Sequence, residues 1–305
     1  MSAIYKREIR SYFGNMYGYI YLAFTLCVIG VYLALTNLLG GTAEMAYTFS
    51  DMAFMSIFLI PILTMRSFAE ERRNKTDMFL LSLPLKPFSI VLGKFLATMT
   101  VFAIPVAVIC IYGLVLRLFS DSAALLGSLG ASLVAGLSYL LLGALLIAIC
   151  MFISSLTDSV VLAAVGGFAA VLVLYGMDYA VSLVKALDVY FPDKAALFSF
   201  VGLIALFVVL GLLAGVFAKS ATVGMITAAA TIVPLSGVYV LCNYKFPEAF
   251  VGLLGKILTY VSAFATFNSM TLGAFSLGGL LFFISAISLF VYLTVQSLER
   301  RRWNS

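Results

Sequence analysis

The sequence predicts an all-α, polytopic membrane protein with about eight transmembrane helices, and three observations lead to that class. Of the 305 residues, 64% are hydrophobic and 10% are charged, whereas a soluble chain has about a quarter charged residues. The mean hydropathy is +1.15. Apolar runs of about twenty residues, long enough to cross a bilayer as a helix, recur along the chain. We therefore expect residues 1–305 to form a single transmembrane domain.

Residues 1–17 predict a helix that lies in the membrane interface before the first span. Tyr5, Ile9, Tyr12, Phe13 and Met16 share one face at helical spacing, and basic residues lie between them. An apolar face beside basic residues is typical of helices that lie flat on a membrane. A frayed terminus is the alternative.

Eight apolar runs are expected to cross the membrane. The second has the shortest uncharged stretch, Met52–Met65, so Asp51 and Arg66 must reach the two interfaces. Pro61 and Pro105 are expected to kink the second and third spans. The predicted spans are Gly18–Leu39, Ala46–Met65, Phe95–Leu116, Leu129–Ile153, Val160–Met177, Ala195–Ala218, Val223–Cys242 and Gly278–Leu298.

A further apolar stripe precedes the last span. It runs from Phe250 to Phe264 with a helical period, and Lys256 and Tyr260 lie off the stripe. We expect a short amphipathic or re-entrant helix at the outer face, because re-entrant backbone is stable where protein buries it.

The basic residues predict the topology. With both termini inside, thirteen of the 18 lysines and arginines lie on the inner side and five on the outer side. Cytoplasmic loops carry such an excess, so we expect a multi-pass plasma-membrane protein with cytoplasmic termini. The net charge of +5 then reflects membrane orientation, and we expect no nucleic-acid partner.

The most polar stretch, residues 66–88, is called the central polar segment. Seven of the chain's 31 charged residues fall within its first twelve positions, so it must project into water. We expect Arg66–Arg73 to continue the second span's helix and Asn74 to end it in a left-handed turn. Thr76 should then cap a short helix, Asp77–Leu83, that stops at Pro84. A solvated loop without a further role is the alternative.

Residue types exclude several kinds of chemistry. The chain has no histidine, which removes histidine-based zinc sites and Ser-His-Asp triads. Gly93-Lys94 and Gly255-Lys256 lack the remaining residues of a phosphate loop. We therefore expect no catalytic, cofactor or metal residues and no enzyme activity. Asp178 is the carboxylate nearest to the interior of a span. It is either an interfacial acid or an ion site of a self-contained channel or secondary transporter, which is the alternative function.

Five stretches carry a family resemblance. Met65–Pro84 (MRSFAEERRNKTDMFLLSLP), followed by Ile90–Ala97 (IVLGKFLA), resembles the permease subunits of type-2 ABC exporters, and among them the gliding-motility and nitrous-oxide-reductase-maturation permeases. Tyr5–Tyr19, Phe152–Thr157 and Leu293–Trp303 agree with this resemblance. That family core is similar to six spans, so residues 185–260 depart from it by two added spans.

The resemblance implies a coupling role for the central polar segment, which in this family rests on a separate cytoplasmic ATPase subunit. The family usually has glycine before the threonine, where this chain has Lys75. A second permease subunit and the lipid bilayer are the other implied partners. The scarcity of buried charge favours an amphipathic, lipid-like or peptide cargo. The implied docking residues are Glu70, Glu71, Arg72, Arg73, Thr76, Asp77, Met78, Phe79 and Leu81.

Overall fold

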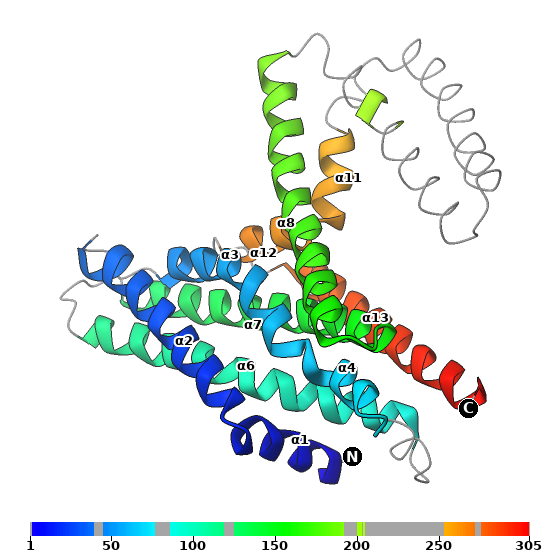
Figure 1. The fold of residues 1–305 in the computed structure, drawn as a ribbon. Coiled ribbons are helices and arrows are strands. Elements are labelled where there is room, and N and C mark those ends of the chain that lie inside the picture. Colours follow the sequence, from blue (N-terminus) through cyan, green and yellow to red (C-terminus); the bar gives the residue numbers. More distant parts are fainter. Residues whose placement is uncertain are drawn as a thin grey trace. The chain divides into compact units, whose positions relative to one another are not determined.

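The computed structural model of the chain describes residues 2–39, 45–76, 86–118, 125–191, 200–202, 204, 253–271 and 276–304. These residues are helical almost throughout and contain no strand, which confirms the all-α class. Figure 1 draws the described helices as ribbons. The helices are α1 (Ser2–Gly14), α2 (Tyr17–Tyr32), the π-helix η1 (Leu33–Leu39), α3 (Met45–Thr64), α4 (Arg66–Arg73), α6 (Pro87–Leu118), α7 (Leu125–Leu156), α8 (Val160–Tyr190), α11 (Leu253–Val261), α12 (Ala263–Thr271) and α13 (Leu277–Asn304).

Six helical stretches within the described residues are long and apolar enough to cross a membrane. They coincide with the first five predicted spans and the last one. The polytopic class is therefore confirmed. The predicted spans Ala195–Ala218 and Val223–Cys242 fall almost entirely outside the described residues, so the count of eight stays a prediction.

The structure corrects two boundaries. The fifth span was expected to end at Met177, but α8 continues to Tyr190 and includes Lys185. Nothing in the sequence after Gly176 stops a helix before Pro192. The described part of the stripe Phe250–Phe264 forms two short helices, not one, because α11 ends at Val261 and α12 begins at Ala263.

A serine lies at the junction of these two short helices. The Ser262 hydroxyl accepts a hydrogen bond from the Ala265 N–H at 3.2 Å, as a helix N-cap does. This cap gives α12 a beginning of its own, which explains why the apolar stripe does not form one helix. The re-entrant path of the stripe stays a prediction.

The chain divides into two compact units. The first contains residues 1–175 and 266–305, and the second contains residues 176–265. In the first unit α7 is central and packs against α3, α6 and α13. Of the apolar windows of α3 and α7, 67% and 72% are buried, against 22% for α2 and η1. Helices α3 and α7 thus form the core of this unit, and α2 lies at its edge.

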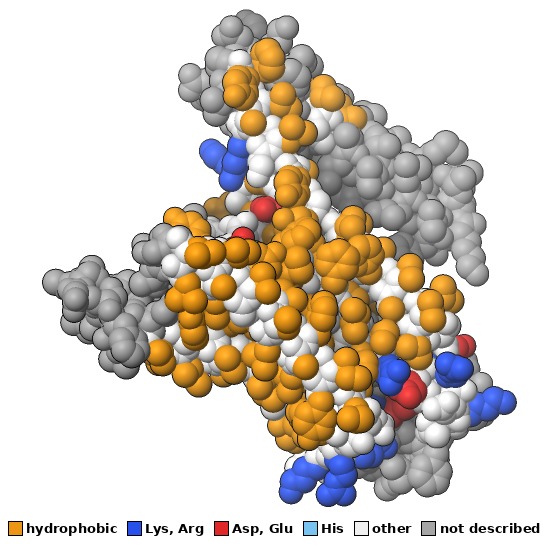
Figure 2. All heavy atoms as spheres, turned by 60° about the vertical axis from the view of Figure 1, so that its left-hand side comes forward, with side chains coloured by type: hydrophobic (Ala, Val, Ile, Leu, Met, Phe, Trp, Pro, Cys, Tyr) orange, Lys and Arg blue, Asp and Glu red, His pale blue; other side chains and the backbone are white. Residues whose placement is uncertain are grey.

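The surface of the first unit is sorted by polarity. Figure 2 shows apolar side chains over most of the visible face of the spans, with most of the lysines, arginines and acids of this unit at one end. Exposed apolar residues on α2 and α13 include Ile20, Phe24, Leu281 and Tyr292. Such a surface suits contact with lipid. The end where the charges gather is called the charged end.

Candidate functional site at the charged end

Helix α4 continues the second span into the charged end. Helix α3 ends at Thr64 and α4 begins at Arg66. Met65 between them has helical backbone angles, φ −54° and ψ −33°. The prediction that Arg66–Arg73 extends the second span is therefore confirmed, with a one-residue break. The break matters because N–H and C=O groups on either side of it need other partners.

The end of α4 differs from the prediction. The left-handed residue is Lys75 (φ 55°), whereas Asn74 has φ −86°. The Lys75 N–H donates to the Arg72 carbonyl and the Thr76 N–H donates to the Glu71 carbonyl, both at 2.9 Å. This pair of bonds is a Schellman motif, in which the left-handed residue is usually glycine. Lys75 thus stands where the resembling family has glycine, and the backbone still makes the turn.

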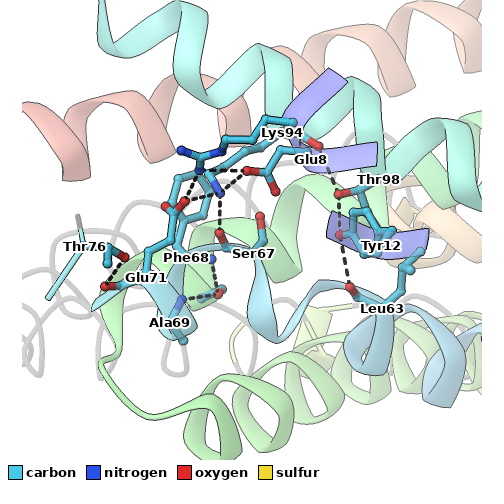
Figure 3. Close-up of polar contacts among 12 residues, drawn as sticks. Glu8, Tyr12, Leu63, Ser67, Phe68, Ala69, Glu71, Thr76, Lys94 and Thr98 are labelled. Carbon is cyan, nitrogen blue, oxygen red and sulfur yellow. Dashed lines mark hydrogen bonds and ion pairs between the residues drawn. The ribbon is translucent and has the colours of Figure 1, made fainter. Parts of the chain in front are cut away.

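A buried lysine joins three helices beside α4. Lys94 of α6 is 2% exposed. Its Nζ lies 3.0 Å from Oε1 of Glu8 on α1 and 3.0 Å from Oε1 of Glu71 on α4. The same nitrogen donates to the Ser67 carbonyl at 2.8 Å. Figure 3 shows Lys94 between the two carboxylates, with all three of its donors used. We call Glu8, Glu71, Lys94 and Arg7 the charge cluster.

The charge cluster is electrically balanced. Arg7 pairs with Glu71 at 2.5 Å and with Glu8 at 3.1 Å, so two cations face two carboxylates. Partial burial acts to lower the pKa of Arg7, but Glu71 and Glu8 together favour the charged form more strongly, so its pKa is raised. Buried charges are stable when each finds its partners, and removal of one partner is costly. The cluster therefore holds α1, α4 and α6 together.

Besides the charge cluster, Tyr12 also holds α1 against α3 and α6. Its hydroxyl donates to the Leu63 carbonyl at 3.4 Å and shares a hydrogen bond with Thr98 at 3.0 Å. Burial raises the pKa of the Tyr12 phenol, so it keeps its proton. A Cβ on Gly18 would lie 2.9 Å from the Tyr12 carbonyl oxygen, which shows how closely α2 folds back on α1. Helix α1 is thus anchored, contrary to the frayed alternative, and its interfacial position stays a prediction.

The opposite side of α4 contacts the end of α7. The buried Ser154 hydroxyl accepts hydrogen bonds from the Phe68 and Ala69 N–H groups, each at 3.2 Å. One turn further along α4, Arg72 donates to the Thr157 carbonyl at 3.3 Å and lies 3.6 Å from the Asp158 carboxylate. Arg301 of α13 pairs with the same carboxylate at 3.3 Å. The end of α7 thus connects α4 to the last span.

The predicted docking residues divide into three groups. Glu70, Arg73 and Thr76 are exposed. Glu71 and Arg72 turn inward and form the ion pairs described above. The remaining four, Asp77, Met78, Phe79 and Leu81, lie outside the described residues, as does the predicted helix Asp77–Leu83.

Sequence reasoning missed the burial of Lys94 and its pairing with Glu8. One signal was available. Glu8 is one helical turn from both Ile4 and Tyr12, which are buried, so it is an acid on an apolar stripe. An acid in that position requires a partner, but the sequence could not show that the partner lies 86 residues away.

A polar cleft opens beside the charge cluster. It has a volume of about 480 Å³ between α1 and α4, and its lining includes Arg7, Asn15, Arg66, Glu70 and Thr76. Both signs of charge face it, so it offers no net field for an anion or a cation. In the described part of the chain, no group of three or more His, Cys, Asp or Glu side chains is placed to hold a metal ion.

These features define a many-span helical membrane protein whose second span carries a helical extension tied into the rest of the charged end. The chain matches the family model described as ABC-2 family transporter protein over residues 14–222, which is more than half of its length. It belongs to that family. The comparison with curated proteins finds no match.

Membership confirms the resemblance at the level of an ABC-2 type permease. The chain is a multi-pass permease subunit of an ABC transporter, a class that works with a partner ATP-binding subunit. The alternative of a self-contained channel or secondary transporter relied on Asp178, which lies half-buried within α8. Family membership favours the permease.

Proposed function

We propose that the central polar segment is the docking site of the ATP-binding subunit and that α4 passes the movement of that subunit to the spans. The charged end is then cytoplasmic, with both termini on that side of the plasma membrane. The chain has no phosphate loop, so ATP is hydrolysed in the partner.

The observation that carries this proposal is the two-sided character of α4. Arg66, Glu70 and Arg73 are exposed on one side of α4. The Arg66 guanidinium lies over the Tyr17 ring, so Glu70 and Arg73 are the residues we propose to meet the partner. The other side is buried, and its contacts reach α1 and α6 through the charge cluster and α7 through Ser154. A push or pull applied to the exposed side therefore reaches three helices at once.

In this proposal the free energy of ATP reaches the spans because the ATP-binding subunit prefers one conformation of the permease over another. A partner can shift a conformational equilibrium only by as much as it prefers one state over the other. An ATP-bound and an ADP-bound subunit that hold α4 differently would supply that preference. Helix shifts of this kind at subunit interfaces are an established form of switching.

Cargo and stoichiometry belong to the same proposal. Charged residues are scarce in the apolar runs of the spans, which favours an amphipathic, lipid-like or peptide cargo, and we propose that the chain belongs with exporters related to gliding-motility and nitrous-oxide-reductase-maturation permeases. The exposed apolar side chains of α2 and α13 are compatible with lipid and with a second permease subunit, and we propose both as neighbours.

The test uses the full chain in nanodiscs with the ATP-binding subunit of its transporter. Glu70→Lys combined with Arg73→Glu reverses two exposed charges on α4. Stimulated ATPase activity should fall about tenfold or more, because like charges brought together at an interface cost several kcal/mol. The matched control, Lys6→Glu with Arg10→Glu, reverses exposed charges on α1 and should leave the stimulation near the native value.

Two outcomes would overturn the docking proposal. One is unchanged stimulation in the α4 variant. The other is an equal loss in both variants, which would indicate a general effect of charge at this end. Glu71 and Arg72 are unsuitable for this test, because their side chains are tied inside the chain and their reversal would disturb the fold.

A further inference from the structure

We infer that Ser154 is a positioning residue that sets how α4 joins α3. It belongs to α7 and lies 86 positions along the chain from the backbone group of Phe68 that it contacts. The inference rests on the proposed function only for the role of α4 in docking. The geometry of the joint stands independently of that role.

Three hydrogen bonds hold the Ser154 hydroxyl at the break. Its Oγ accepts from the N–H groups of Phe68 and Ala69 and donates to the Met65 carbonyl, each at 3.2 Å. The side chain is fully buried. In a continuous α-helix the Phe68 N–H would bond the Thr64 carbonyl. The Ser154 hydroxyl thus replaces the Thr64 carbonyl as the acceptor for the Phe68 N–H. A side chain inserted in this way between backbone hydrogen-bonding groups is a known cause of helix kinks.

Two tyrosines supply partners on the other side of the break. The Tyr17 hydroxyl donates to the Ile62 carbonyl, and the Tyr12 hydroxyl donates to the Leu63 carbonyl at 3.4 Å. In a continuous helix these carbonyls would accept from residues 66 and 67. Groups on both sides of the break therefore have partners from α1, α2 and α7, so the break is built into the fold.

Such a joint has two arrangements of similar free energy. In one, α3 and α4 are separate and Ser154 bonds to Met65, Phe68 and Ala69. In the other, α3 and α4 are continuous and the Ser154 hydroxyl is released. Hydrogen bonds are exchanged for hydrogen bonds, so the net difference is small. Movement of α4 by a docked subunit would then favour one of the two arrangements over the other.

The joint also leads into the core of the molecule. Arg72 contacts the Thr157 carbonyl at 3.3 Å, so α4 touches the end of α7 at both Ser154 and Thr157. Helix α7 is the central helix of its unit. A change at the joint therefore acts directly on the helix that α3, α6 and α13 pack against.

The test measures the joint without any ATP-binding subunit. Nitroxides are placed on unnatural amino acids at the exposed positions Tyr47 and Arg73 of the full chain in nanodiscs, and pulsed electron resonance gives their separation. A continuous helix over these 26 steps would be about 39 Å long. Ser154→Ala removes the inserted hydroxyl, so the ratio of the continuous to the broken arrangement, read from the populations near and away from that length, should rise about five- to thirtyfold relative to the native chain.

Ser155→Ala is the matched control. Ser155 is also fully buried, but its hydroxyl donates at 2.7 Å to Phe152 in its own helix, so its loss should leave the distances as in the native chain. Ser154→Thr keeps a hydroxyl at this position and should keep the native distances. If Ser154→Ala does not insert, Ser154→Cys keeps the side-chain volume and weakens the hydrogen bonds, and it is measured in the same way.

Unchanged distances in Ser154→Ala would overturn the inference, as would equal shifts in Ser154→Ala and Ser155→Ala. Failure of the docking proposal would appear only in ATPase stimulation and would leave these distances untouched. The two proposals can therefore fail separately.

Discussion

Replacement of Lys94 by methionine should lower the free energy of unfolding by an amount near the lower end of about 3 to 5 kcal/mol, the usual cost of breaking a buried ion pair. The lysine is 2% exposed and its nitrogen has three acceptors within 3.0 Å. Its loss leaves the carboxylates of Glu8 and Glu71, whose side chains are 13% and 18% exposed, with Arg7 as their remaining partner. Because Arg7 still compensates part of that charge, we expect the lower end of the range.

The measurement is equilibrium unfolding of the full chain in mixed detergent micelles. Lys86→Met removes an exposed lysine from the segment just before α6 and should change stability by less than about 0.5 kcal/mol. A triple variant that adds Glu8→Gln and Glu71→Gln to Lys94→Met removes the unpaired charges and should recover most of the loss, because neutral replacement of a buried ion pair is often tolerated.

Two results would refute the reasoning. Equal effects of Lys94→Met and Lys86→Met would show that the buried contacts contribute nothing measurable. A triple variant as unstable as Lys94→Met alone would show that the loss comes from packing of the lysine stem and not from uncompensated carboxylates.

Two further substitutions test the local geometry by thermal unfolding. Lys75→Gly should raise stability by about 1 kcal/mol or less, because glycine adopts the left-handed turn without a steric cost, whereas Asn74→Gly, at φ −86°, should give no gain. Gly143→Ala should cost about 1 to 3 kcal/mol, because the new methyl group would overlap the ring of the buried Phe102. Gly130→Ala has open space around it and should be neutral or slightly stabilising; a loss as large as that of Gly143→Ala would contradict this.

Much of the fold could be predicted from the sequence because a helix that crosses lipid needs about twenty consecutive apolar residues. The first two spans were expected at Gly18–Leu39 and Ala46–Met65, and the structure places the helices at Tyr17–Leu39 and Met45–Thr64. The ends agree within a residue because charged residues, glycines and loops bound the apolar runs. Where such a boundary was weak, as after Met177, the predicted end was wrong.

The inward face of α4 could not be predicted in the same way. Sequence patterns detect a buried face by its apolar residues, but this face carries Glu71 and Arg72. Their charges are compatible with burial only because Lys94 and Asp158 compensate them. From the sequence, all the charged residues of this segment therefore looked equally available to a partner.

The sequence by itself determined the class, the six described spans, the helical extension of the second span and the uneven charge at the two sides, because each depends on composition and local order along the chain. Only the tertiary structure decided which charges face a partner and which face the interior, and that Ser154 occupies the break between α3 and α4. The physical reason is distance along the chain: these contacts join residues 23 to 143 positions apart, and no local pattern encodes such pairs.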